Sequence, residues 1–214
     1  KGSSGAEDTV GRIYRCVTER IRYVGDEAGL GGYIPRPAGE TWENRAGDCK
    51  DIALLLSVLL REKGIPADIA LLRTADSGNA DMSFPALSSF NHAVCRVSLA
   101  KPLYLDGTVR KSGIMDLPLP DRDVDVLVIG KEKPFVERID GALYSVPEEN
   151  AETTVTIRPD LNAVCTRSVI RGGVLSVADD DSTDGRYLSR YWTKLYPGAE
   201  IGGLTRTGGN GLPL

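Results

Sequence analysis

The sequence has few of the residues from which metal and redox sites are built. Its 214 residues include one histidine and four cysteines, and no two cysteines form a C-x-x-C pair. This spacing argues against a zinc ribbon and against a thioredoxin-type motif. A chain of this length can bury a full core without disulfides, so we expect free thiols.

Excess positive charge and long apolar runs are also lacking. The net charge of -4 offers no field that would attract nucleic acid, so a nucleic-acid partner is not expected. The longest apolar run, residues 52–60, is interrupted by Ser57. It is much shorter than the roughly 18 apolar residues that cross a bilayer, so no membrane span is expected in this chain.

Helical periodicity is present in the first part of the chain. The predicted helices cover about residues 8–22, residues 38–45, and a segment that starts at Cys49 and ends before Gly64. The third has a wide apolar stripe, and Gly64 followed by Pro66 is typical of a helix end. We therefore expect it to be the central buried helix. A loop rich in glycine and proline, residues 25–37, precedes it.

Strand-like segments follow the helices, at residues 67–73, 90–99 and 102–106. This order predicts an α+β fold in which N-terminal helices pack on an antiparallel sheet. The core is expected over residues 8–110, after a cloning remnant or linker at residues 1–7. Prolines then interrupt short apolar runs, which predicts a β-rich extension over residues 111–214 with one late helix at about 185–195.

Cys49 stands at the first turn of the predicted central helix. Unpaired backbone N–H groups and the positive end of the helix dipole stabilise a thiolate there. Such placement lowers the pKa of a thiol from about 8.5 into the range of roughly 3.5 to 7.5. Cys49 is therefore a candidate nucleophile. The alternative is a small buried residue that packs the helix end.

A nucleophilic thiolate needs a partner that can later protonate the leaving amine. His92 is the sole histidine and hence the candidate, although its strand position also suits a core histidine. Asp106 ends the next predicted strand, where it could accept the other imidazole N–H and orient the ring. Its alternative is a turn aspartate in an Asp-Gly hairpin pair.

Four segments closely resemble motifs of the transglutaminase-like superfamily, in the order of that family. They are Gly47-Asp48-Cys49-Lys50-Asp51, residues 59–67, Asn91-His92-Ala93-Val94 and Leu105-Asp106-Gly107-Thr108. The resemblance is strong over about residues 8–110. Residues 21–24 and 31–37 are similar to a variant found in large bacterial multidomain proteins, which implies that this chain is a piece of such a protein.

The resemblance implies a papain-like α+β scaffold with Cys49 as nucleophile, His92 as general base and acid, and Asp106 as the orienting carboxylate. The implied reaction is acyl transfer on amide bonds of a protein or peptide substrate, as in peptidases, amidases, deamidases and transglutaminases. It needs no cofactor and no metal. The family also favours a periplasmic or cell-surface location.

The tetrahedral intermediate of such a reaction needs an oxyanion hole, and the Cys49 backbone N–H is the natural first donor. Family members often supply an upstream aromatic residue as well. Tyr23, Tyr33 and Trp42 are the candidates, each with an alternative role in core or loop packing. A second functional hypothesis also stays open, in which the chain is a catalytically silent peptide-binding or assembly module.

Overall fold

The computed structural model describes residues 3–25, 32–83, 86–110, 112–130, 133–160, 162–176, 193–194, 196–198 and 200. The chain divides into two compact units, Lys1–Val177 and Ala178–Leu214. The helix predicted over residues 185–195 lies outside the described residues, apart from residues 193 and 194, which are helical. All elements discussed below belong to the first unit.

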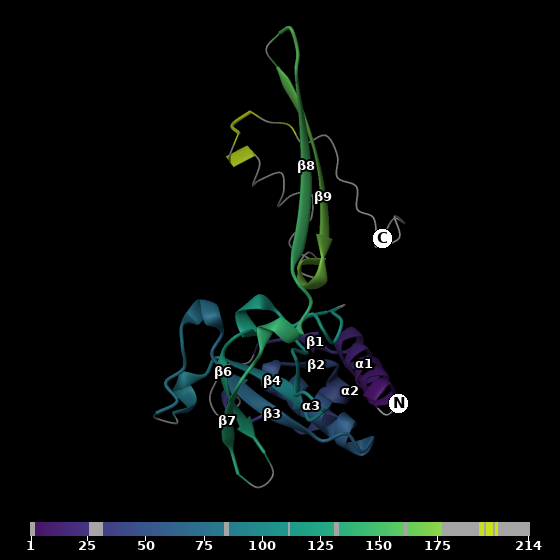
Figure 1. Ribbon diagram of the computed structural model, residues 1–214, viewed down its shortest axis with the longest axis vertical. Helices are drawn as coiled ribbons and strands as arrows, with labels where there is room; N and C mark the ends of the chain where they lie inside the picture. Colours follow the sequence, from purple (N-terminus) through teal and green to yellow (C-terminus); the bar gives the residue numbers. More distant parts are fainter. Residues whose placement is uncertain are drawn as a thin grey trace. The chain divides into compact units, whose positions relative to one another are not determined.

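Three α-helices precede the main sheet in the chain (Figure 1): α1 (Ser3–Arg20), α2 (Ala38–Asn44) and α3 (Cys49–Glu62). Ile52, Leu56 and Leu60 of α3 are fully buried. Their spacing of four residues places them on one face of the helix, which explains why α3 is the central helix. Helix α1 begins at Ser3 rather than near Asp8, so it extends into the segment expected to be a remnant or linker.

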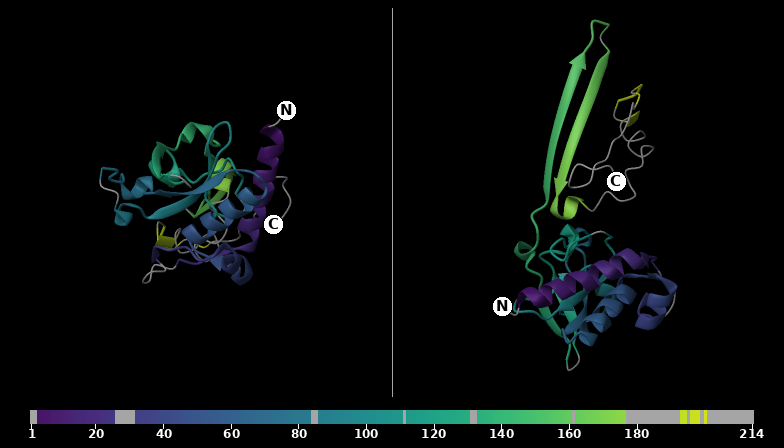
Figure 2. Two further views of the ribbon diagram at one scale, coloured as in Figure 1. Left: turned by 90° about the horizontal axis from the view of Figure 1, so that it is seen from below. Right: turned by 90° about the vertical axis from the view of Figure 1, so that its right-hand side faces the viewer.

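The helices pack on a five-stranded antiparallel sheet with the order β5-β4-β3-β6-β7. Its strands are β3 (Ala67–Leu72), β4 (His92–Val97), β5 (Leu103–Leu105), β6 (Asp125–Ile129) and β7 (Phe135–Arg138). Helix α3 contacts β3 and β4, while α1 and α2 contact α3 (Figures 1 and 2). The predicted α+β class, with helices on an antiparallel sheet, is confirmed.

The sheet does not end near residue 110, where the sequence analysis placed the end of the core. Strand β6 pairs with β3 on the edge opposite β4, in a register that aligns Ile69 with Ile129. Without β6, the apolar strand β3 would present an unpaired edge, which is unfavourable. Val126 and Val128 are fully buried, so these strands complete the same core.

Two further strand pairs complete the described elements. Strands β1 (Arg22–Tyr23) and β2 (Ala46–Gly47) form a short parallel pair. Strands β8 (Glu148–Ile157) and β9 (Ala163–Gly172) form an antiparallel hairpin. Every side chain of β8 is exposed, so this strand has no burial pattern by which the sequence could define its bounds. Among the described helices, none is long and apolar enough to cross a membrane.

Candidate active site

Cys49 is the first residue of α3, and the residues around it fix the start of that helix. The Asp48 side chain accepts a hydrogen bond from the Asp51 N–H, and the Asp51 side chain accepts one from the Asp48 N–H, each at 3.2 Å. This capping box satisfies two of the donors that a helix start leaves unpaired. The Lys50 ammonium is paired with the Asp48 carboxylate, so the charge of Asp48 is balanced within the motif.

Gly47 is required by the packing just before the cysteine. A Cβ at this position would lie 2.9 Å from Asp51 Cβ and 3.0 Å from Thr41 Cγ2, closer than ordinary contacts allow. Gly47 also pairs with Tyr23 across the β1–β2 ladder. The close approach holds α2, β1 and the start of α3 together at one point.

Asp51 links the start of α3 to the loop that precedes α2. Its side chain is 1% exposed and accepts hydrogen bonds from the Arg36 N–H at 2.7 Å, from Nε at 2.9 Å and from Nη2 at 2.5 Å. Burial acts to raise the pKa of Asp51, but the bonds from Arg36 and Asp48 outweigh it and hold the pKa below its usual value. Arg36 is thereby held against the start of α3.

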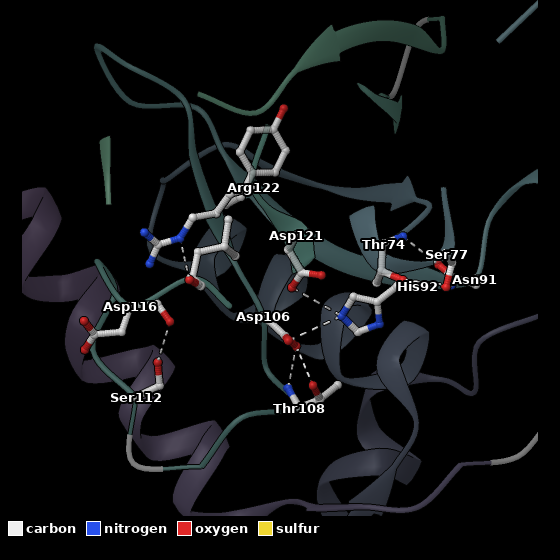
Figure 3. Close-up of polar contacts among 12 residues, drawn as sticks. Thr74, Ser77, Asn91, His92, Asp106, Thr108, Ser112, Asp116, Asp121 and Arg122 are labelled. Atoms are coloured by element: carbon white, nitrogen blue, oxygen red, sulfur yellow. Dashed lines mark hydrogen bonds and ion pairs between the residues drawn. The ribbon is translucent and has the colours of Figure 1, made fainter. Parts of the chain in front are cut away.

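His92 begins β4, opposite Leu72 of β3, and its side chain is 14% exposed. Its Nε2 lies 3.4 Å from Asp106 Oδ2 (Figure 3), and the Cys49 side chain also interacts with the ring. Since Nε2 faces the carboxylates, Nδ1 is the nitrogen available to the cysteine. Burial acts to lower the pKa of His92, but Asp106 and Cys49 outweigh it and raise the pKa well above its ordinary value.

The segment before His92 is held by a polar network (Figure 3). Asn91 Oδ1 accepts a hydrogen bond from the Thr74 N–H at 2.9 Å, and Nδ2 donates to Thr74 Oγ1 and Ser77 Oγ, each at 3.0 Å. The Asn91 N–H also donates to Leu72 O at 3.0 Å. These bonds fix the chain that enters β4 and hence the position of the imidazole.

Asp106 follows β5 and is 4% exposed. Its Oδ1 accepts hydrogen bonds from the Thr108 N–H at 2.8 Å and from Thr108 Oγ1 at 2.7 Å, which leaves Oδ2 to face His92. The Tyr14 hydroxyl of α1 donates to the Asp106 carbonyl at 2.6 Å. Burial acts to raise the pKa of Asp106, but His92 and Thr108 outweigh it and lower the pKa, so this carboxyl is ionised beside the imidazole.

Asp121 is a second carboxyl at the same imidazole, and sequence reasoning missed it. It ends a short 3-10 helix, η4 (Leu119–Asp121), and its Oδ2 lies 3.8 Å from His92 Nε2 (Figure 3). Its local sequence, an aspartate after Pro120, is typical of a turn and carries no chemical signal. Only the fold brings it to the site.

Within the described residues, one group has the composition and spacing of a metal site. The ligand atoms of His92, Asp106 and Asp121 all lie within 4.8 Å of one another. A divalent cation held there would bind Nε2 of His92, the imidazole nitrogen that faces Asp106. The three groups could therefore hold either a metal or a proton, but the interaction of His92 with Cys49 fits proton transfer.

The three aromatic candidates for the oxyanion hole have different surroundings. Trp42 packs against the core and stacks on Arg20, whose Cζ lies 4.1 Å from the ring centre, which is the packing role. Tyr33 is 61% exposed, so its side chain points largely into solvent. Tyr23 lies in β1 and pairs with Gly47, which is two residues before the cysteine.

All four cysteines are free thiols, as predicted, and they differ in exposure. Cys16 and Cys165 are exposed, Cys95 is buried, and Cys49 is intermediate. Burial raises the pKa of Cys95 far above its ordinary value, so this thiol is unreactive. The chain thus contains exposed and buried reference thiols for experiments on Cys49.

Comparison with a family model supports the family resemblance. Residues 1–103 match the model of the transglutaminase-like superfamily. A candidate protease from Parabacteroides distasonis is 18% identical, with a TM-score of 0.49 over 64% of this chain and 25% of that one. A candidate cysteine protease from Cytophaga hutchinsonii is 16% identical, with a TM-score of 0.38 over 77% of this chain and 44% of that one. No curated protein matches.

Helices packed on an antiparallel sheet, with a cysteine at a helix start and a histidine on a strand, define a papain-like α+β class of protein. The family match agrees with this class and covers the part of the chain that carries Cys49 and His92. The match over residues 1–103 confirms the recognition of the transglutaminase-like superfamily for the part of the chain that it covers. The chain spans less than half the length of either similar structure.

Proposed function

We propose that this chain is a cysteine-dependent enzyme that transfers acyl groups from amide bonds of a protein or peptide substrate. The observation that carries the proposal is the position of His92, which lies 3.4 Å from Asp106 Oδ2 and also interacts with the Cys49 side chain. Nucleophile, proton carrier and orienting carboxylate thus follow one another in space.

In the proposed mechanism, the Cys49 thiolate attacks the carbonyl carbon of an amide, and a C–S bond forms as the carbonyl oxygen becomes an oxyanion. Collapse of this intermediate breaks the C–N bond. The imidazolium of His92 gives its proton to the departing amine, and a thioester remains on Cys49. Water or a second amine then attacks the thioester, loses its proton to His92 and releases the thiolate.

The charges around His92 support this sequence of proton transfers. Asp106 is ionised and raises the pKa of His92, so the imidazole carries a proton while the thiolate is the attacking group. The same carboxylate fixes the ring, because its other oxygen is held by Thr108. The proton donor is therefore both charged and oriented when the amine leaves.

The oxyanion of the intermediate is assigned to the backbone N–H of Cys49. As the first residue of α3, Cys49 has an N–H that no intrahelical acceptor can satisfy, and the helix dipole favours negative charge there. Tyr23 is the candidate for a second donor, since its strand pairs with Gly47. Each donor would act on charge that is present only in the intermediate.

The test uses denatured casein and a labelled primary amine, cadaverine, with three readouts. New amino termini indicate a peptidase, ammonia release without labelling a deamidase, and incorporation of the label a transglutaminase. Cys49→Ala is expected to abolish whichever activity the protein shows, while Cys165→Ala, at an exposed free thiol, retains it. Full activity in Cys49→Ala would contradict the proposal. If the unaltered protein and Cys49→Ala bind casein equally well and neither turns it over, the binding module is favoured instead.

A further inference from the structure

Asp121 occupies a position that the proposed mechanism does not use. Its side chain is 3% exposed, and its Oδ2 lies 3.8 Å from the same His92 nitrogen that faces Asp106. Among the described residues this Oδ2 has no hydrogen-bond partner. A buried carboxylate oxygen without a hydrogen-bond donor costs free energy, so the lack of a donor needs a physical explanation.

The segment that carries Asp121 is firmly held. The Asp121 N–H donates to Pro118 O at 3.1 Å. The next residue, Arg122, donates from Nε to Leu117 O and from Nη1 to Ser145 O, each at 2.8 Å. These contacts on both sides of Asp121 fix the carboxyl beside the imidazole.

A proton on Asp121 accounts for the unsatisfied oxygen. The pKa of Asp121 is raised to about 7, mainly by burial and next by the charge of Asp106. A protonated Asp121 can donate a hydrogen bond to Asp106, whereas two ionised carboxylates are acceptors only. The other charged groups near this pair are His92, with Cys49 behind it, and Asp76, whose charge also raises the pKa of Asp121.

We propose that Asp121 is a positioning residue that acts through His92. Asp121 and Asp106 both face Nε2 of His92, and Asp121 sets how strongly the imidazole holds its proton. An effect of Asp121 on catalysis rests on the proposed function, whereas its effect on the titration of His92 does not. When neutral, Asp121 holds Asp106 in place by donating to it. When ionised, it adds a second negative charge beside the imidazolium and makes His92 a weaker acid.

The test exploits the fact that His92 is the only histidine in the chain. The ring resonances of a single imidazole can be followed by NMR against pH without ambiguity. In the unaltered protein we expect two inflections, one near pH 7 from Asp121 and one at higher pH from His92 itself. In Asp121→Asn the first inflection disappears and the His92 midpoint falls by about one pH unit.

Asp125→Asn is the matched control, because Asp125 is an exposed carboxyl on β6 that pairs with Arg138. It is expected to leave both inflections unchanged. An unchanged His92 midpoint in folded Asp121→Asn would overturn the proposal. If that variant fails to fold, the absence of any inflection near pH 7 in the unaltered protein overturns it equally.

The result is independent of turnover. A protein that shows both inflections but cleaves or modifies no amide contradicts the proposed function and leaves the role of Asp121 intact. Conversely, a working enzyme whose His92 titrates identically with and without Asp121 keeps the proposed function and loses this inference. In an active protein, Asp121→Asn is also expected to move the alkaline limb of the pH–rate profile to lower pH, whereas a purely structural role would lower the rate equally at all pH values.

Discussion

Ile52 and Gly107 lie so close together that residue 107 has no room for a side chain. A Cβ on Gly107 would lie 2.3 Å from Ile52 Cγ2. Ile52 is on the first turn of α3, after Cys49, while Gly107 directly follows Asp106. This contact therefore ties the orienting carboxylate to the helix that carries the cysteine, although the two are far apart in sequence.

Gly107→Ala tests that contact. The added methyl group must displace Ile52 or the turn at Asp106, and overpacking of this kind costs about 1–3 kcal/mol of the free energy of unfolding. Urea denaturation measures the loss. Gly39→Ala is the control: it lies in α2 with no atom within 4 Å of the new Cβ, so it should be neutral or slightly stabilising. Equal stability of Gly107→Ala and the unaltered protein would contradict the account.

Asp51→Asn tests how strongly Arg36 is anchored to α3. Because the folded state lowers the pKa of Asp51, its charged interactions stabilise the fold above the unfolded pKa and are lost as the pH falls through the folded pKa. The variant should lose about 1–3 kcal/mol at neutral pH, a range that allows for the partly exposed Arg36, and the difference should shrink below about pH 4. Urea denaturation across this pH range measures it.

Asp125→Asn serves as control for Asp51→Asn as well. The Asp125–Arg138 pair has side chains that are 49% and 60% exposed, and such pairs contribute little. The stability of this variant should stay within about 1 kcal/mol of the unaltered protein. A pH-independent loss in Asp51→Asn would show that packing rather than charge is responsible.

Thr108→Val tests how Asp106 is oriented. The change removes the hydroxyl that donates to Asp106 Oδ1 at 2.7 Å while keeping the side chain nearly isosteric. A lost hydrogen bond to a charged acceptor should lower the rate of Cys49 alkylation at neutral pH about tenfold. Thr108→Ser keeps the hydroxyl and should retain most of the rate. Equal rates in the two variants would show that this bond does not orient Asp106.

Local sequence signals were sufficient to predict where α3 starts and to recognise the family. Residues 48–51 contain both halves of a capping box, and the apolar positions behind them have helical spacing, so the helix beginning at Cys49 could be predicted from adjacent residues alone. His92 was a candidate because the chain has no other histidine. In these cases the evidence lay within a few residues of the feature.

Features that depend on distant segments could not be predicted in this way. Asp121 reaches His92 only because η4 lies beside the start of β4, and the pairing of β6 with β3 has no marker in either strand. The bond from Arg36 to Asp51 likewise joins a loop to a helix. Periodicity reports burial of a segment but not the identity of its neighbours.

The pH dependence of Cys49 alkylation tests the central claim most directly, because it requires no substrate. Iodoacetamide labelling is followed at each cysteine by mass spectrometry, with the exposed Cys16 and Cys165 as internal references. We predict that Cys49 reacts about tenfold or more faster than these references at pH 6, and that His92→Ala removes this advantage. A Cys49 rate that matches the references, or one that is unaffected by the loss of His92, would contradict the account.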